Sequence, residues 1–347
     1  MKTIDGVNKV GFAVLGLGIG RAHAEAITTS KNAYLVCACD IDESRRAGFS
    51  KRYPSVPLYN DFEEMIKNDE IDVVCVCLPT YLHAEYARKV LAAGKHCLVE
   101  KPADTTVERA KDLGECAKAA GKKLGFVFQN RFNYSMYPIY EAIRSGRLGD
   151  IYLGTFSVKW LRKQSYYDAN GGWRGTWDKD GGGSLMNQSI HTVDLMLTIM
   201  GNEIEEVSSA GGVFAHDIEA EDTTASVIKF KNGSMATFVS TTCAYNGLST
   251  EIGIYGTNGS IECDGDKIVR WRLRDDPDGI EEEEILEAYG MGNLFAAQKH
   301  PDARCGHGYI IDDMADAVLS DREPVISLDE ALKSVALIER VYKNIRK

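Results

Sequence analysis

Residues 9–128 alternate between short apolar runs and helical segments, and this alternation constrains the fold more than any other feature of the chain. The runs "KVGFAVLG", "AYLVCACD", "IDVVCVCLP" and "KKLGFVF" predict strands, and the segments between them read as helices. Apolar strands that alternate with helices form parallel sheets with helices on both faces. We therefore predict an α/β fold that begins with a doubly wound parallel sheet.

A glycine-rich turn, "GLGIG", joins the first predicted strand to the first predicted helix. Glycines at this place let the main chain approach a pyrophosphate, and the helix N-terminus supplies N–H donors. Asp40 ends the second strand, where such sites carry the carboxylate that binds the adenosine ribose. The alternative is an ordinary glycine turn with a surface aspartate. The order of strand, turn, helix and acid favours a dinucleotide site formed by Gly16, Gly18, Ile19, Gly20 and Asp40.

The same aspartate bears on the choice of cofactor. A carboxylate beside the ribose repels a 2′-phosphate, so we expect NAD to be preferred over NADP. Arg45 and Arg46 follow closely in the sequence and keep NADP possible.

Composition excludes several classes of function. The formal net charge of -11 argues against a protein that tracks nucleic-acid phosphates. No apolar run approaches the roughly 20 residues of a membrane-spanning helix, so we expect a cytoplasmic protein. The nine cysteines include pairs that alternate along predicted strands, which indicates buried hydrophobic side chains rather than zinc ligands. We therefore predict no metal site.

The segment "AGKHCLVEKPADTTVERA" resembles the Gfo/Idh/MocA family, which includes glucose–fructose oxidoreductase and inositol dehydrogenases. "GLGIGRAHA", "SGRLGDI" and "GGGSLMNQSIHTVDLM" follow the order of that family, although the glycine turn is one residue shorter than its commoner form. The resemblance implies a Rossmann domain, residues 1–128, and an α/β domain, residues 129–347, built on a large, open, mostly antiparallel sheet. Strand patterns with Asn-Gly turns in the second half agree with this fold.

The resemblance also implies a cis peptide bond before Pro102 and a catalytic role for Lys101. The "EKP" motif ends a parallel strand at its carboxyl edge, where open α/β sheets bind ligands. A lysine there can stabilise a developing alkoxide. The alternative is a solvated lysine in a turn. We predict further cofactor contacts from neighbouring loop positions, namely Pro79, Thr80, His83, Glu100 and Lys101 itself.

The segment "GGGSLMNQSIHTVDLM" predicts a helix that carries Asn187 and His191 one turn apart on one face. Histidine is well suited to proton transfer near neutral pH, and Asp194 could orient its ring. The three glycines would let the main chain pass close to something bulky, for which the nicotinamide end of the cofactor is one choice. The alternative is a buried helix with an incidental histidine. Many relatives carry aspartate where this chain has Asn187, and some that act on nucleotide-linked sugars carry asparagine.

Two further segments supply candidate substrate contacts. Asn130 and Arg131 follow the last strand of the first domain and should face the cleft. A polar, aromatic loop follows the first strand of the second domain, where aromatic rings could stack on a sugar and arginine could hold an anion. The alternative is a folded surface loop. The predicted substrate contacts are Asn130, Arg131, Tyr166, Trp173, Arg174, Asn187 and His191.

Together these features predict an NAD(P)-dependent oxidoreductase that transfers a hydride between nicotinamide and a secondary alcohol of a sugar, cyclitol or nucleotide sugar. One alternative is a dinucleotide-binding sensor or scaffold without turnover, and another is a reductase of an imine or enone. An open antiparallel sheet with few helices to cover it predicts a homodimer or homotetramer.

Overall fold

The computed structural model describes residues 1–4, 6–299 and 304–346. The chain forms two compact units, of which the first comprises residues 1–128 and 307–332 and the second comprises residues 129–306 and 333–347. We expected residues 129–347 to form one domain. The chain instead returns to the first unit at His307 before it finishes in the second.

The first unit contains the predicted parallel sheet. Its strands lie in the order β4-β3-β2-β5-β6-β7, and the N-terminal β1 pairs antiparallel with β2. The order reverses between β2 and β5, which makes the carboxyl ends of these two strands the switch point where such sheets bind ligands. The strands are β1 (Lys2–Ile4), β2 (Val7–Leu15), β3 (Ala33–Cys39), β4 (Leu58–Tyr59), β5 (Val73–Val76), β6 (His96–Val99) and β7 (Leu124–Phe126).

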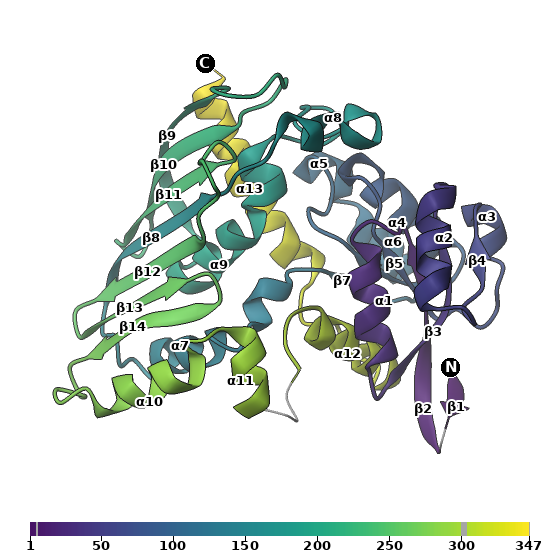
Figure 1. Ribbon diagram of the computed structural model, residues 1–347, viewed down its shortest axis with the longest axis horizontal. Coiled ribbons are helices and arrows are strands. Elements are labelled where there is room, and N and C mark those ends of the chain that lie inside the picture. Colours follow the sequence, from purple (N-terminus) through teal and green to yellow (C-terminus); the bar gives the residue numbers. More distant parts are fainter. Residues whose placement is uncertain (5, 300–303, 347) are drawn as a thin grey trace. The chain divides into compact units, whose positions relative to one another are not determined.

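Helices and short turns connect these strands, as the alternation of the sequence predicts (Figure 1). Residues 10–15 of β2 and all four residues of β5 are buried, because a parallel sheet is covered on both faces. The helical elements are α1 (Gly20–Thr28), α2 (Glu43–Arg52), α3 (Phe62–Met65), η1 (Thr80–Leu82), α4 (His83–Ala92), α5 (Val107–Ala110) and α6 (Leu113–Ala120).

The returning segment is attached to the first unit by specific contacts. Helix α12 (Gly306–Leu319) accepts a hydrogen bond on Asp312 from the Ser30 hydroxyl, at 2.5 Å. One helical turn later, the Asp316 carboxylate accepts a hydrogen bond from the Asn32 side-chain amide, at 2.7 Å. Further along, the Ile326 carbonyl accepts from the Phe126 N–H of the edge strand β7. These partners lie some 200 to 280 residues apart in the sequence, so no local sequence pattern predicts their contacts.

The second unit is built on the predicted large sheet. Its strands lie in the order β14-β13-β12-β8-β11-β10-β9, and every pair is antiparallel except β8 with β11. Gly233, with φ +89°, lies in the Asn-Gly turn between β10 and β11, as the hairpin signal requires. The strands are β8 (Ile151–Lys159), β9 (Ile204–Gly212), β10 (Thr223–Phe230), β11 (Met235–Thr241), β12 (Thr250–Gly256), β13 (Gly259–Asp264) and β14 (Lys267–Leu273).

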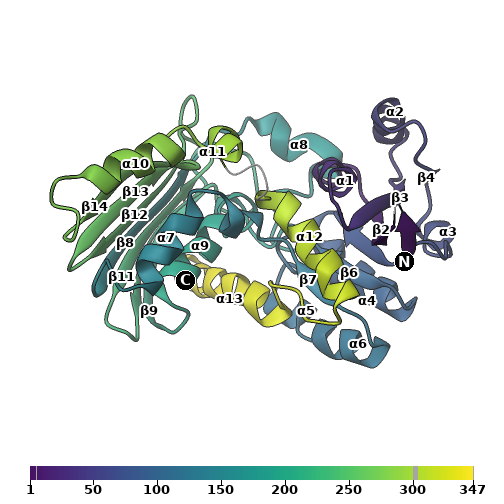
Figure 2. The same cartoon turned by 90° about the horizontal axis from the view of Figure 1, so that it is seen from below.

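Helices of the second unit gather on one face of this sheet, where α7, α9 and α13 lie (Figures 1 and 2). Figures 1 and 2 show no helix of the described residues over the opposite face. No described helix is both long and apolar enough to cross a membrane. The helical elements are η2 (Gln129–Phe132), α7 (Met136–Arg144), α8 (Gln164–Gly172), η3 (Ser184–Gln188), α9 (Ile190–Met200), α10 (Ile280–Tyr289), α11 (Asn293–Lys299) and α13 (Leu328–Ile345).

Candidate active site

The glycine turn follows β2 at the switch point of the first unit, and its three glycines have different surroundings. Gly16 has φ +94°, and a Cβ there would lie 2.5 Å from the Cys77 carbonyl oxygen. A Cβ on Gly20 would lie 2.5 Å from Val14, so this glycine lets α1 pack against β2. A Cβ on Gly18 would have no neighbour within 4 Å. The turn is therefore an open cradle at Gly18, which fits the pyrophosphate of a dinucleotide.

Asp40 lies beside this cradle. Its Oδ2 accepts from the Leu17 N–H at 2.7 Å, and its Oδ1 accepts from the Asp42 N–H at 2.8 Å. The Arg45 guanidinium lies 3.5 Å from Oδ2, and Arg46 donates to the Asp40 carbonyl. The carboxylate thus stabilises the glycine turn itself, and an arginine partly balances its charge. Its contact with a ribose stays a prediction.

The loops after β5 and β6 lie at the same edge of the sheet and are held together by His83. One ring nitrogen of His83 lies 2.8 Å from the Leu78 carbonyl oxygen, and the other lies 2.6 Å from that of Pro102. His83 is 2% exposed, so it braces the two loops. The peptide bond between Lys101 and Pro102 is cis, as the resemblance implies. Pro79 and Thr80 form the start of η1 in the same loop.

Glu100 is buried directly before Lys101 and is surrounded by histidines. Its Oε2 accepts from the Lys101 N–H at 3.1 Å, and its Oε1 lies 2.8 Å from His23 Nε2 and 3.6 Å from His307 Nε2. Burial would raise the pKa of Glu100, but the hydrogen bond from His23 and the nearby ring of His307 bring it well below its usual range. The carboxylate therefore fixes the main chain that carries Lys101. We did not anticipate His23, because a histidine within the first helix has no sequence signal of its own.

In the second unit, the predicted helix begins with a π-helical turn, η3, and continues as α9. Every residue from Gly181 to Leu197 is buried except Asn187 and His191. The apolar stripe that we expected lies in the core, and these two polar side chains face away from it. The structure thus brings Asn187 and His191 to one face, as the spacing predicts.

Two of the three glycines before this turn, Gly182 and Gly183, lie against other parts of the protein. A Cβ on Gly182 would overlap the Tyr342 hydroxyl, and a Cβ on Gly183 would overlap the carbonyl and carboxyl oxygens of Glu221. The Tyr342 hydroxyl donates to Glu221 Oε1 at 2.8 Å, and Glu221 Oε1 also accepts from the Leu185 N–H. The bulky neighbour that we expected to be the nicotinamide is therefore this buried pair, which lies far from the glycines in sequence.

Asn187 is held by hydrogen bonds of both polarities. Its Nδ2 donates to Asp180 Oδ1 at 2.6 Å, and its Oδ1 accepts from the Tyr166 hydroxyl at 3.0 Å. Gln188 donates to Asn187 Oδ1 and to the Tyr166 hydroxyl. Asp180 is fully buried, so an aspartate at position 187 would place two carboxylates in contact. The neighbouring Asp180 therefore accounts for an amide instead of a carboxylate at position 187. Sequence analysis did not identify Asp180 as a partner of Asn187.

His191 lies beside Gln129, whose Nε2 is 3.3 Å from the histidine Nε2. Asp194, which we expected to orient the ring, accepts two hydrogen bonds from Arg131 at 2.6 Å, one on each oxygen. This bidentate ion pair is 12% exposed on the arginine side. It balances the charge of Arg131 within the unit, and a substrate contact of Arg131 stays a prediction.

The aromatic loop joins the same cluster. The Arg174 guanidinium lies 4.5 Å from the Tyr166 ring centroid and 4.8 Å from that of Trp173. Because Tyr166 donates to Asn187, the loop residues lie next to the helix that carries His191. Asn130 instead lines a separate hollow of about 200 Å³ with Thr192 and Asp266.

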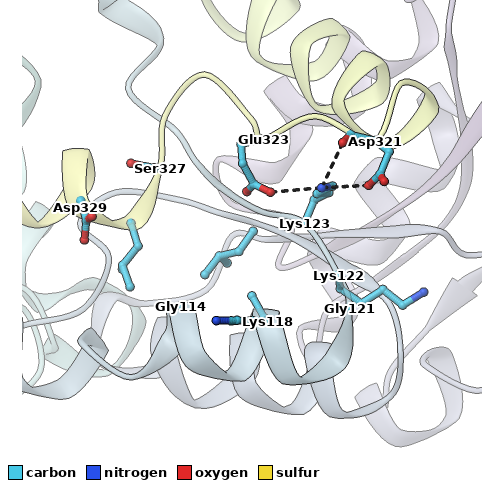
Figure 3. Close-up of a pocket in the computed structure, with 12 residues that line it drawn as sticks. Gly114, Lys118, Gly121, Lys122, Lys123, Asp321, Glu323, Ser327 and Asp329 are labelled. Atoms are coloured by element: carbon cyan, nitrogen blue, oxygen red, sulfur yellow. Dashed lines mark hydrogen bonds and ion pairs between the residues drawn. The ribbon is translucent and has the colours of Figure 1, made fainter.

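A larger hollow of about 630 Å³ opens in the first unit, but it lies at the wrong edge of the sheet for the cofactor (Figure 3). It is next to Leu124, where β7 begins, whereas the glycine turn follows the end of the parallel β2. Lys123 bonds there to Asp321 and Glu323, at 3.0 and 3.1 Å. This hollow therefore adds nothing to the dinucleotide cradle.

The cysteines of the parallel sheet are buried free thiols. Burial raises the pKa of Cys37 to about 12 and that of Cys39 to about 11, so both stay protonated near neutral pH. They act as small hydrophobic side chains.

Comparison with known proteins gives matches over both units. Residues 10–128 match a family model described as oxidoreductase family, NAD-binding Rossmann fold, and residues 138–262 match that of the GFO/IDH/MocA C-terminal domain. The WlbA dehydrogenase of Bordetella pertussis, solved with NADH and UDP-GlcNAcA, is 31% identical with a TM-score of 0.86, over 98% of this chain and 96% of that one. Two curated relatives are each 28% identical. These are D-glucoside 3-dehydrogenase of Escherichia coli, over 75% of this chain and 71% of the relative, and myo-inositol 2-dehydrogenase of Thermotoga maritima, over 73% and 75%.

Proposed function

Because the chain belongs to the Gfo/Idh/MocA family of NAD-binding oxidoreductases, we propose that it oxidises a secondary alcohol of a nucleotide-linked sugar. The observation that carries this proposal is the face formed by Asn187 and His191, the two side chains of residues 181–197 that are not buried. A similar chain, WlbA of Bordetella pertussis, was solved with a nucleotide sugar.

Oxidation of an alcohol removes a hydride from carbon and a proton from oxygen. The nicotinamide cofactor, when bound, accepts the hydride. His191 accepts the hydroxyl proton, because imidazole exchanges protons near neutral pH. Lys101 stabilises the alkoxide with its positive charge. Asn187 donates from its Nδ2 to a neighbouring hydroxyl and so orients the sugar.

The test is a substrate panel of free sugars, cyclitols and nucleotide sugars, offered with NAD and followed at the absorbance band of the reduced nicotinamide. We expect turnover with nucleotide sugars and slower or no turnover with free sugars and inositols. NADH binding without turnover of any alcohol would favour a sensor or scaffold. Reduction of an imine or enone in place of alcohol oxidation would also overturn the proposal.

We further propose that the enzyme prefers NAD to NADP. Asp40 borders the open cradle at Gly18, and its negative charge opposes a 2′-phosphate. Arg45 at 3.5 Å weakens this opposition. The ratio of kcat/KM with NAD to kcat/KM with NADP should fall in Asp40→Ser, or drop below one. If the unmodified enzyme has the higher kcat/KM with NADP, the arginines dominate and the assignment to Asp40 is wrong.

Finally, we propose that a second copy of the chain covers the open face of the large sheet. Val227 and Met235 are on this face and are 49% and 47% exposed. Apolar side chains in a sheet without a covering layer favour association. Light scattering at micromolar concentration should give a dimer or tetramer, and a monomer would contradict the proposal.

A further inference from the structure

Two arginines and three aromatic rings alternate beside Asn187. The Arg162 guanidinium lies 5.0 Å from the ring centroid of Trp160 and 5.3 Å from that of Tyr166. Arg174 lies 4.5 Å from Tyr166 and 4.8 Å from Trp173. The central ring, Tyr166, is thus contacted by both cations and donates its hydroxyl to Asn187. We call these five residues the arginine ladder.

In the described part of the chain, no acid balances either arginine of the ladder. Among the residues that the structure describes, no carboxylate lies within 4 Å of the Arg162 or Arg174 guanidinium. Each donates one Nη1 hydrogen bond to a main-chain carbonyl, Arg162 to Leu161 and Arg174 to Tyr166. A guanidinium has five N–H donors, and stacking on a ring occupies its face and leaves its edge for an anion. Both arginines therefore keep donors for a ligand.

The main chain that carries Arg162 is fixed by a buried cluster. The His216 Nε2 lies 2.9 Å from the Arg162 carbonyl oxygen, and its Nδ1 lies 3.1 Å from Asp222 Oδ2. Asp222 is fully buried and accepts main-chain N–H bonds from Phe214, Ala215 and His216. The Arg162 N–H donates to the Thr242 carbonyl. These bonds hold one end of the ladder in place before any ligand binds.

We propose that the ladder is the anion-binding part of the substrate site, where Arg162 and Arg174 take a carboxylate or phosphate group of the sugar substrate. This proposal rests on the proposed function, because Tyr166 links the ladder to Asn187 and so to the face of His191. Two guanidinium edges that no described carboxylate contacts suit an oxyanion such as a carboxylate or phosphate, which each can bind through paired hydrogen bonds. The substrate class is then an acidic or phosphorylated sugar, and neutral free sugars and inositols are poor substrates.

The experiment compares three probes that separate the two sources of negative charge. UDP-N-acetylglucosaminuronic acid carries a carboxylate and a diphosphate, UDP-N-acetylglucosamine carries only the diphosphate, and free glucuronic acid carries only the carboxylate. The enzyme is tested as Arg162→Gln and Arg174→Gln, which remove the charge and keep much of the side-chain length. Arg346→Gln is the matched control, because Arg346 also stacks on a tryptophan, 3.7 Å from the Trp177 ring centroid.

Loss of one charged hydrogen bond should lower kcat/KM by about 10- to 100-fold in each ladder variant. A loss confined to the acidic nucleotide sugar assigns the carboxylate to the ladder, and an equal loss with both nucleotide sugars assigns the diphosphate. Both outcomes support an anion site. Values within about twofold of wild type for both nucleotide sugars, in folded variants, would overturn it. Arg174→Lys, which keeps the charge, should recover part of the activity.

A binding measurement separates this proposal from the proposed function. Calorimetry on the NADH-loaded protein follows the binding of UDP and of glucuronic acid without turnover. If no nucleotide sugar is oxidised but the ladder variants lose affinity for either anion relative to Arg346→Gln, the proposed function fails and the anion site stands. If neither anion binds the wild-type protein, the anion site is wrong whatever the turnover.

Discussion

Two glycine-rich turns start helices in this protein, one in each unit, and they exist for opposite physical reasons. At Gly18 of the first turn, a side chain would meet empty space. At Gly182 and Gly183 of the second, a side chain would overlap Tyr342 and Glu221. The first turn leaves room for a ligand, and the second is filled by the protein itself. A run of glycines therefore indicates close approach without saying what approaches.

The largest effect on stability should follow from adding a side chain at Gly183, in the turn that the protein itself fills. In Gly183→Ala the new methyl group would overlap the main-chain carbonyl of Glu221, which cannot rotate away. Overpacking of this kind typically costs 1–3 kcal/mol, and we expect a loss of about 3 kcal/mol in the free energy of unfolding. Chemical denaturation measures it. Gly48→Ala is the control, because Gly48 likewise lacks a positive φ and its Cβ has no neighbour within 4 Å; an equal loss there would show that contact with Glu221 does not set the cost.

An intermediate effect on stability should come from the protonation of Glu221, the buried acid that lies against this turn. Burial raises the pKa of Glu221 to about 8, against hydrogen bonds from Leu185 and Tyr342 that lower it, and nearby Asp180 raises it further. The folded protein therefore holds a proton that the unfolded chain releases near pH 4.5. The stability from this group is fully present below about pH 4.5 and is lost as pH rises through about 8, by at most about 1.4 kcal/mol per pH unit.

Glu221→Gln removes this titration, so the free energy of unfolding should fall less steeply with pH between 5 and 8 than in the wild type. Urea denaturation at several pH values measures the slope. Glu206→Gln, at an exposed position of β9, should leave the slope unchanged. Identical slopes for Glu221→Gln and the wild type would contradict a protonated Glu221.

The smallest effect on folding should come from the open turn. Gly18→Ala adds a methyl group that has no protein atom within 4 Å, so the free energy of unfolding should stay within about 0.5 kcal/mol of the wild type. The affinity for NADH should nevertheless fall by roughly tenfold, equal to about 1.4 kcal/mol, because the main chain can no longer approach the pyrophosphate. Fluorescence titration measures the affinity. Unchanged NADH affinity would mean that Gly18 does not contact the cofactor.

The sequence predicted what local patterns encode. Alternating strands and helices predicted the parallel sheet, and the spacing of Asn187 and His191 singled out the two partly exposed positions of a buried helical segment. The partners of these residues come from distant segments and had no local signal. Tyr342 reaches the 181–183 turn across about 160 residues, and the segment from His307 returns to the first unit across about 180.

Choices between partners were also hidden. Asp194 follows His191 by one helical turn, and this spacing made it a candidate to orient that ring. The structure gives both of its oxygens to Arg131, because a bidentate ion pair in a buried position satisfies two charges at once. Spacing identified Asp194 as a neighbour of His191 but gave no sign of the ion pair with Arg131, which lies 63 residues away in the sequence.

The most direct test of the proposed function is single-turnover reduction of NAD by Lys101→Ala and His191→Ala with a nucleotide sugar at saturation, alongside fluorescence titration of NADH. We expect each variant to lose about 10² to 10⁴ in rate. His191→Ala should keep NADH affinity within about threefold, because it leaves the predicted cofactor contacts untouched. Thr198→Ala, an exposed position on α9, controls for the helix itself. Turnover of His191→Ala close to that of Thr198→Ala would contradict the account and make the histidine incidental.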